Sequence, residues 1–268
     1  MQTLFRSTLR HWLVIASLAF TAVHALAADS AALPAREKFH LYLLIGQSNM
    51  AGRGAVEAQD KQPHPRVLAL TKDGRWVPAV DPIHFDKPIA GVGLGTTFGK
   101  VMAERDAAVT IGLLPCAVGG TPIARWQKGA DLYEAALKRA QAAAPHGVFK
   151  GILWHQGEAD SGKEETAKLY AGKLDAMIAA WRADLEQPGL PVVVGQLGEF
   201  YLGGAGLKLV RETLQTTPDR VKQTAFVPAT DLNHKGDKVH FDAAAYREFG
   251  KRYAAAMVKL QGGAAETK

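Results

Sequence analysis

The sequence FHLYLLIGQSNM at residues 39–50 joins an apolar run to a polar turn. The run, residues 39–45, has strand length and is nearly unbroken, as is typical of a strand buried inside a parallel sheet. Gly46 permits a tight turn, and Ser48 stands where such a turn would lift its hydroxyl into a cleft. The pattern predicts a first core strand with a functional turn at its end.

Outward from this strand, strand-like and helix-like segments alternate. Further strands are predicted at 108–114, 149–154, 191–197 and 225–227, a hairpin insertion over 66–77, and helices at 96–105, 131–144, 164–185, 207–216 and 242–260. Because right-handed crossovers cover both faces of a parallel sheet with helices, we expect an α/β fold, a flavodoxin-like three-layer α/β/α sandwich with a mostly parallel central sheet. Ligands bind beyond the carboxyl ends of such strands, so polar residues that follow strands are the candidates for a site.

The N-terminal residues differ in character from the rest. Arg6 and Arg10 precede an apolar stretch over 12–26, and the small-x-small pattern at 25–27 suits a signal peptidase. A membrane anchor is the alternative, but polar residues interrupt the stretch, which is shorter than the about 20 apolar residues of a spanning helix. We expect a signal peptide at 1–27, one domain at 28–268, no stable membrane anchor after cleavage, and an exported protein, periplasmic or extracellular.

Composition is that of an ordinary globular protein, with 47% hydrophobic and 22% charged residues. Cleavage after Ala27 would lower the formal net charge from +6 to +4, because Arg6 and Arg10 are lost and no acid is lost with them. The remaining basic residues are scattered among acids, which argues against a nucleic-acid partner. Cys116 is the only cysteine, so no intrachain disulfide can form.

Ser48 is the candidate nucleophile, although a serine after a strand is also a common helix N-cap. Near the C-terminus, Asp237 precedes His240 by three residues, so one turn can carry both side chains. A serine hydroxyl needs an imidazole base near neutral pH, and a carboxylate best fixes the tautomer of that imidazole. Asp237 and His240 provide this pair. Asp231 is a competing carboxylate, and Asp242 is a candidate cap of the last helix.

Residues 154–160 form an unusually polar group after an apolar strand. Gln156 offers a neutral amide that could donate to an oxyanion, and a surface-loop amide is the alternative. His155 and Glu158 could be read as a metal pair. A catalytic zinc site usually needs three protein ligands, however, and no third one stands at helical spacing. We therefore expect no metal site.

Gly119 and Gly120 follow the strand predicted at 108–114 and would let a backbone amide approach a ligand closely. An ordinary glycine turn is equally compatible with this pair. Arg125 and Trp126 come shortly after and could line a sugar site, the indole by stacking and the guanidinium by hydrogen bonding. Core packing of the indole is the alternative.

Four groups of residues, in order, resemble one family, the carbohydrate esterases of family six and the related sialate O-acetylesterase domains, a branch of the SGNH hydrolases. The groups are residues 45–50, the glycine pair with Arg125 and Trp126, residues 154–158 and residues 237–241. The resemblance covers roughly 39–260 and implies the SGNH-hydrolase fold for the domain at 28–268.

The resemblance also implies roles for individual residues. It makes Ser48 the nucleophile, His240 the general base and Asp237 its orienter. It implies an oxyanion hole built from the Ser48 amide, a backbone amide of Gly119 or Gly120, and the Gln156 side chain. Further substrate contacts are then expected from Gln47, Asn49, Arg125, Trp126 and Glu158.

The implied reaction removes acetyl groups from a carbohydrate, of the acetylated xylan or sialic acid type, through an acetyl-enzyme and without a cofactor. Gln47 and Gln156 stand where the broader superfamily often has aspartate and asparagine, and both departures are typical of this branch. Another acyl-ester serine hydrolase and a catalytically silent carbohydrate-binding protein are the alternatives. These residues do not specify the sugar, the ester position or the oligomeric state.

Overall fold

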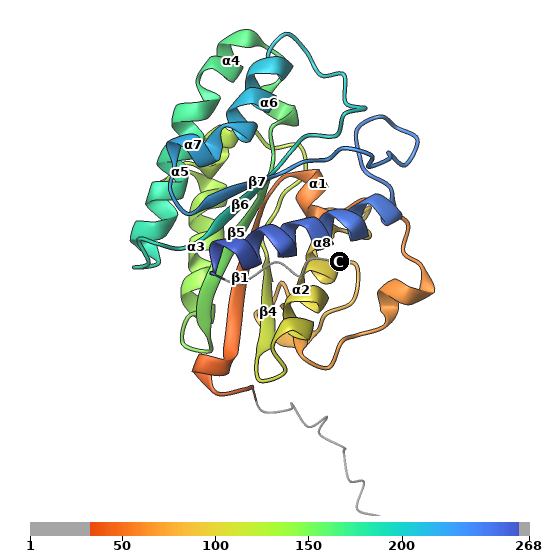
Figure 1. The fold of residues 1–268 in the computed structure, drawn as a ribbon, viewed down its shortest axis with the longest axis vertical. Helices are drawn as coiled ribbons and strands as arrows, with labels where there is room; N and C mark the ends of the chain where they lie inside the picture. The colour runs from red at the N-terminus through yellow and green to blue at the C-terminus, as the bar shows by residue number, and fades with distance from the viewer. Residues whose placement is uncertain (1–32, 263–268) are drawn as a thin grey trace, which may run out of the picture. The chain divides into compact units, whose positions relative to one another are not determined.

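The computed structural model describes residues 33–262, and within them a seven-stranded sheet forms the centre of the fold (Figure 1). In the order β3-β2-β4-β1-β5-β6-β7, every neighbouring pair is parallel except β2 with β3. The predicted mostly parallel sheet and the predicted hairpin are therefore confirmed. The strands are β1 (Phe39–Gly46), β2 (Val67–Leu70), β3 (Trp76–Pro78), β4 (Thr110–Pro115), β5 (Val148–His155), β6 (Val192–Gly195) and β7 (Thr224–Val227).

Strand β1 lies in the middle of the sheet, as its apolar sequence predicts. All of its residues are buried except the half-buried His40. It pairs with β4 on one side and β5 on the other, so that Leu43 lies opposite Leu114 and Ile152. A strand with neighbours on both edges and helices on both faces has no polar side to expose, which is why it reads as a continuous apolar run.

Helices cover both faces of the sheet (Figure 1). On one face, α2 (Leu94–Arg105) and α8 (Ala243–Leu260) pack together in a core that includes Tyr42 and Leu44. Leu41 and Leu43 belong to the second core, because successive side chains of a strand point to opposite faces. The helices α3 (Asp131–Ala143), α5 (Tyr170–Asp184) and α6 (Leu207–Gln215) also contribute to that core. This arrangement confirms the three-layer α/β/α sandwich.

One predicted helix is wrong in detail. Residues 164–185 do not form a single helix, because the chain breaks at Leu169 between α4 (Glu164–Lys168) and α5. The break leaves Leu169 58% exposed while Tyr170 and Leu174 are buried. The remaining short elements are α1 (Ser48–Ala51), α7 (Thr217–Arg220) and the 3-10 helices η1 (Arg36–Lys38), η2 (Ala58–Lys61), η3 (Ile123–Trp126) and η4 (Glu158–Asp160).

The order of the strands reverses at β1. Without the β2–β3 hairpin the sheet has the order β4-β1-β5-β6-β7, which is the flavodoxin-like arrangement with the first strand flanked by the second and third. In open α/β sheets the crevice for a ligand lies at such a switch point, beyond the carboxyl ends of the strands. Ser48 directly follows the carboxyl end of β1, so the topology places it at this position.

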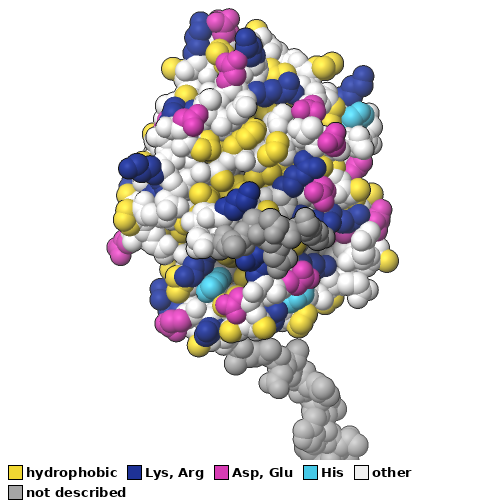
Figure 2. Space-filling view, in the orientation of Figure 1, with side chains coloured by type: hydrophobic (Ala, Val, Ile, Leu, Met, Phe, Trp, Pro, Cys, Tyr) yellow, Lys and Arg dark blue, Asp and Glu magenta, His cyan; other side chains and the backbone are white. Residues whose placement is uncertain are grey.

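On the face drawn in Figure 2, Lys and Arg side chains lie among Asp and Glu instead of forming a patch of one sign. Across residues 33–262, none of the helices combines the length and apolar character needed to span a membrane. The predicted signal peptide at 1–27 lies outside the described residues. Its cleavage, the export of the protein and its final location stay predictions.

Candidate active site

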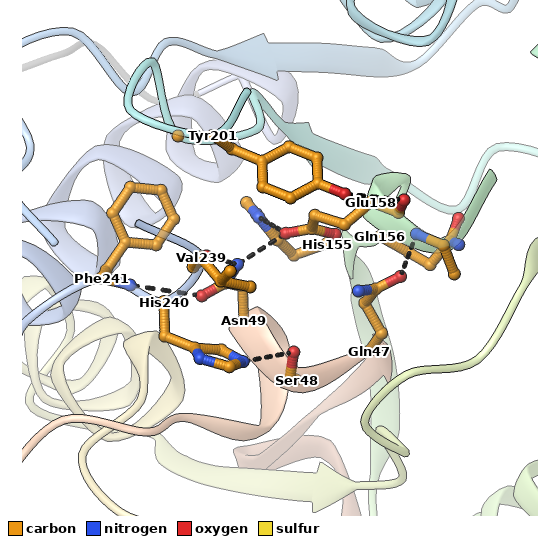
Figure 3. Close-up of polar contacts among 12 residues, drawn as sticks. Gln47, Ser48, Asn49, His155, Gln156, Glu158, Tyr201, Val239, His240 and Phe241 are labelled. Atoms are coloured by element: carbon orange, nitrogen blue, oxygen red, sulfur yellow. Dashed lines mark hydrogen bonds and ion pairs between the residues drawn. The ribbon is translucent and has the colours of Figure 1, made fainter. Parts of the chain in front are cut away.

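The turn between β1 and α1 presents Ser48. Gly46 has a φ of +133°, and a Cβ at this position would overlap the backbone carbonyl of His155, so glycine is required here. Gln47 is extended and is the N-cap of α1, without a side-chain capping bond. Ser48 is the first residue of the helix, and its hydroxyl points to His240 (Figure 3). The N-cap alternative for Ser48 is therefore wrong.

Three predicted residues form a hydrogen-bonded chain. His240 Nε2 lies 3.0 Å from Ser48 Oγ, and His240 Nδ1 lies 2.7 Å from Asp237 Oδ2. The other carboxylate oxygen of Asp237 accepts the backbone N–H groups of Val239 and His240, at 2.9 and 2.8 Å. Because three residues of one turn share these bonds, the carboxylate fixes both the backbone and the ring of the histidine.

The charge of Asp237 is stabilised within this turn. Burial acts to raise the pKa of its carboxyl, but the hydrogen bonds from the His240 amide, the His240 imidazole and the Val239 amide lower the pKa well below its ordinary value. Asp242 takes the second expected role, since its side chain accepts the Ala245 N–H at 2.7 Å and caps α8. The two aspartates thus have separate tasks.

Asn49 links the turn after β1 to its neighbours. Its Nδ2 atom donates to Glu158 Oε1 at 2.5 Å and to the carbonyl of Val239 at 3.0 Å (Figure 3). Its Oδ1 atom accepts the Tyr246 hydroxyl at 2.7 Å and the Phe241 N–H at 3.4 Å. The residue beside the candidate nucleophile therefore holds the loop that carries His240.

Three residues expected to contact substrate make hydrogen bonds within the protein. Gln47, Asn49 and Glu158 are all buried, and each side chain bonds within the protein. Gln47 Oε1 accepts the Ala159 N–H at 3.3 Å, which joins the turn after β1 to η4. Their hydrogen bonds show that these side chains hold the site together, and substrate contact by them stays a prediction.

Gln156 is also committed to the protein. Its side-chain amide donates to the carbonyl of Thr121 at 3.0 Å and to Asp160 Oδ2 at 2.6 Å, and the residue is fully buried. An amide group has two hydrogens, and these two acceptors use both of them. Gln156 therefore has no free donor for an oxyanion in this structure, and its oxyanion role stays a prediction.

The two glycines differ in their backbone bonds. The Gly119 N–H donates to Asp86 Oδ2 at 2.8 Å. The Gly120 residue is exposed, with a φ of +78°. Within residues 33–262 the N–H groups of Ser48 and Gly120 donate to no protein acceptor, so these two of the predicted donors are free for a ligand.

Arg125 and Trp126 lie on η3 but face different surroundings. Trp126 is fully buried, its indole N–H donates to Thr121 Oγ1 at 3.2 Å, and its ring packs edge-on against Trp154 at 5.8 Å between centroids. It presents no face on which a sugar could stack, so the core-packing alternative is correct. Arg125 is partly exposed and is paired with Asp131 on the surface.

A buried ion pair beside the glycines was not predicted. Arg53 and Asp86 contact each other through two hydrogen bonds, the shorter of them 2.6 Å from Arg53 Nη2 to Asp86 Oδ2. Both side chains are only 1% exposed. Asp86 lies in the Pro- and Gly-rich loop before α2, where no periodic pattern connects it to Arg53.

His155, the last residue of β5, and Glu158, the first residue of η4, lie close together. His155 Nε2 and Glu158 Oε1 are 3.8 Å apart. Burial lowers the pKa of His155 to about 3, and burial raises the pKa of Glu158 against the hydrogen bond from Asn49. His155 Nδ1 also lies 3.1 Å from the Tyr253 hydroxyl. In the part of the chain that the structure describes, no group of three His, Cys, Asp or Glu side chains could hold a metal ion.

A family model described as carbohydrate esterase, sialic acid-specific acetylesterase, matches residues 38–259. The chain belongs to this family. It is therefore a carboxylic ester hydrolase of the carbohydrate acetylesterase class, and the resemblance seen in the four sequence motifs is confirmed.

Relatives agree with this membership. A probable carbohydrate esterase of Arabidopsis thaliana is 35% identical over 231 residues, which cover 78% of this chain and 86% of the relative. The crystal structure of the Arabidopsis protein has a TM-score of 0.77 at 32% identity, covering 82% of this chain and 98% of that one. NanS has a TM-score of 0.74 at 17% identity, covering 86% and 99%. A carbohydrate acetylesterase from Xanthomonas citri has a TM-score of 0.65 at 22% identity, covering 82% and 56%; these last two likenesses concern the fold.

Proposed function

We propose that this family member hydrolyses O-acetyl groups on a carbohydrate with Ser48 as nucleophile, His240 as general base and Asp237 as its orienter. The observation that carries the proposal is the continuous chain from Ser48 Oγ to His240 Nε2, at 3.0 Å, and from His240 Nδ1 to Asp237 Oδ2, at 2.7 Å. A nucleophile within reach of a base that a third group orients is the arrangement that nucleophilic acyl transfer requires.

Acylation begins when Ser48 Oγ attacks the carbonyl carbon of the acetyl group and its proton passes to His240 Nε2. The tetrahedral intermediate collapses by breaking the bond between the carbonyl carbon and the sugar oxygen. The imidazolium donates its proton to that oxygen, and the deacetylated sugar leaves. Asp237, whose pKa is held low, stays ionised and stabilises the positive charge that His240 carries during this step.

Deacylation repeats these proton transfers with water. His240 removes a proton from a water molecule as the water oxygen attacks the acetyl-enzyme. The bond to Ser48 Oγ then breaks, the proton passes from His240 to Ser48 Oγ, and acetic acid leaves and ionises to acetate. The whole cycle uses protein groups and water.

The negative oxygen of each tetrahedral intermediate needs donors that are already in place. The free N–H groups of Ser48 and Gly120 are the donors that we assign to it. Gln156 is not assigned to it, since Thr121 and Asp160 occupy both of its amide hydrogens.

For the substrate, the description of the family favours O-acetylated sialic acid, and acetylated xylan is the alternative sugar. The test measures acetate released from each of these substrates, and from p-nitrophenyl acetate, by the chain purified without residues 1–27. Ser48→Ala and Thr216→Ala are run beside it, with EDTA as a metal control. Thr216 is the matched control because its exposed hydroxyl lies at the end of α6.

We expect Ser48→Ala to lose activity with an unchanged melting curve, Thr216→Ala to retain it, and EDTA to have no effect. Release of acetate from one sugar and not from the other would define the substrate class. A folded wild-type chain that cleaves none of the three acetyl esters would reject the proposal and favour another acyl ester or a binding role.

Export is part of the same proposal, because Arg6 and Arg10 precede an apolar stretch over 12–26 that ends in a small-x-small pattern at 25–27. Expression of the full chain in a bacterial host with a Sec system should give a mature protein beginning at Ala28. Mass spectrometry of the periplasmic fraction tests this expectation, and a full-length chain retained in the membrane fraction would contradict it.

A further inference from the structure

The Arg53–Asp86 ion pair connects three segments around the candidate nucleophile. Arg53 Nη1 donates to the carbonyl of Gly52 at 2.7 Å, just after α1, while both terminal nitrogens of Arg53 contact the carboxylate of Asp86. Asp86 Oδ2 in turn accepts the N–H of Gly119 at 2.8 Å. One chain of charged hydrogen bonds thus runs from α1 through the loop before α2 to the glycine pair.

Gly119 lies between this ion pair and Ser48. A Cβ built on Gly119 would be 2.5 Å from Arg53 Nη2, 3.0 Å from Asp86 Oδ2 and 3.3 Å from the Cβ of Ser48. There is no room for a side chain, so the backbone of Gly119 is held between the ion pair on one side and the nucleophile on the other. The next residue is Gly120, whose backbone N–H is free.

A gain in folding stability does not explain well why the Arg53–Asp86 ion pair is buried. Removing two charges from water costs about as much as their attraction returns, and a buried ion pair is often no more stabilising than apolar residues of the same size. A bidentate, charge-assisted contact does fix geometry, because its hydrogen bonds are short and directional. With both side chains 1% exposed, neither group can contact a substrate.

We propose that the buried Arg53–Asp86 pair is the positioning element of the oxyanion hole, which fixes the Gly119 backbone against Ser48 so that the Gly120 N–H serves as the second donor. This inference rests on the proposed function. Arg53 and Asp86 act through the backbone of Gly119, and they are positioning residues, not catalytic ones.

The test compares Asp86→Asn with Asp60→Asn in the same acetate-release assay. Asp60 is the matched control, because it is a buried carboxylate bonded by Arg247 through Nε at 2.8 Å and Nη2 at 2.7 Å, yet it makes no contact with Ser48 or the glycines. We expect Asp86→Asn to lower kcat about 10-fold to 100-fold with KM within about threefold, as for loss of oxyanion stabilisation. Asp60→Asn should lower the melting temperature and leave kcat of the folded protein unchanged.

Chemical rescue separates positioning from general loosening. In Asp86→Ala, added formate can occupy the space of the missing carboxylate and accept from both Arg53 and Gly119. We expect formate to raise kcat of this variant several-fold at constant ionic strength, with no increase for the wild type or for Asp60→Asn. Arg53→Lys, which keeps the charge but not the bidentate contact, serves as the second variant if Asp86→Ala does not fold, and should also lower kcat.

The inference is overturned if folded Asp86→Asn has the wild-type kcat. It is also overturned if kcat of Asp86→Asn falls no more than kcat of Asp60→Asn and formate does not raise kcat of Asp86→Ala. If Asp86→Asn itself does not fold, an unchanged kcat in Arg53→Lys overturns the inference. An inactive wild-type chain would instead reject the proposed function, so the two failures can be distinguished.

Discussion

Asn49 Nδ2 lies 2.5 Å from Glu158 Oε1, and this one hydrogen bond joins the turn after β1 to the turn after β5. The same amide also donates to Val239, in the loop before α8. Three carboxyl-end segments of the sheet are therefore connected through a single side chain. The position of His240 relative to Ser48 depends on this connection as well as on the histidine's own turn.

Asn49→Ala should reduce both stability and activity. The change removes the acceptor of the buried Tyr246 hydroxyl and leaves Glu158 without its donor. Since an unsatisfied buried polar group costs about 1–3 kcal/mol, we expect a loss of roughly 2–4 kcal/mol in the free energy of unfolding, measured by urea titration. Tyr246→Phe, which removes one of these bonds, should lose less than half as much. Equal losses in the two variants would show that the network is not centred on Asn49.

Ser48→Ala should abolish turnover without weakening the fold. The Ser48 hydroxyl caps no helix, because the N-cap of α1 is Gln47, so the free energy of unfolding should change by less than about 1 kcal/mol. The rate should fall about 10³-fold or more. Acetate release and urea unfolding are measured on the same preparation. A stability loss above about 2 kcal/mol with residual turnover would instead indicate a structural role for the hydroxyl.

Gln156→Ala distinguishes an oxyanion donor from a structural amide. Burial raises the pKa of Asp160, and hydrogen bonds from the Ile123 N–H and from Gln156 oppose that shift. Without Gln156, the pKa of Asp160 in the folded state should rise further above its value in the unfolded state. A carboxyl with a raised folded-state pKa contributes stability at low pH, and this contribution is lost as pH rises through that pKa. Urea unfolding should therefore show a larger loss at pH 8 than at pH 5. A pH-independent stability with an about 100-fold lower kcat would restore the oxyanion role.

Trp126→Phe should change stability and not substrate affinity. The smaller ring leaves a void beside Trp154 and removes the bond to Thr121, so we expect a loss of about 1–3 kcal/mol in the free energy of unfolding. KM for the acetylated sugar should stay within about twofold of the wild-type value. Arg125→Ala, on the adjacent surface, should alter stability by less than about 0.5 kcal/mol. A severalfold higher KM in Trp126→Phe would mean that the indole does reach the substrate.

Asp81→Asn should stabilise the protein at alkaline pH. Burial raises the pKa of Asp81 to about 7, against a hydrogen bond from Thr96. A carboxyl whose folded pKa exceeds its unfolded value contributes stability at low pH and loses it as pH rises through the folded pKa. The variant should resemble wild type at pH 5 and be more stable by a few kcal/mol at pH 8.5, since a tenfold change in an acid constant equals about 1.4 kcal/mol. Exposed Asp73→Asn should show no such gain in thermal unfolding at pH 8.5.

The sequence was sufficient to predict the sheet and the three side chains that form a hydrogen-bonded chain. Ser48 follows an apolar strand and Asp237 shares one turn with His240, so both assignments depend on local spacing. The surroundings of Gln156 and Trp126 could not be predicted, because the direction of a side chain after a strand or within a 3-10 helix depends on tertiary packing. Trp126 packs against Trp154, which lies 28 residues later in the chain. Local spacing cannot predict a contact between such distant residues.

Arg53 and Asp86 were missed for a related reason. Their pairing spans 33 residues and crosses the hairpin insertion, and Asp86 lies in a loop without hydrophobic periodicity. A lone arginine five residues after Ser48 resembles any surface charge in the sequence. Arg53 is buried against Asp86 because the fold brings the carboxyl ends of β1 and β4 and the loop before α2 together, and the sequence alone does not show this.

The hydrogen bond between Ser48 and His240 joins residues 192 positions apart. A ribosome therefore completes almost the whole domain before these two side chains can meet. Under the proposed function, a chain that stops short of residue 237 lacks both the general base and its orienter. Truncated molecules should therefore not hydrolyse esters. If the proposed function holds, the specific activity of a preparation would measure the fraction of its chains whose synthesis is complete.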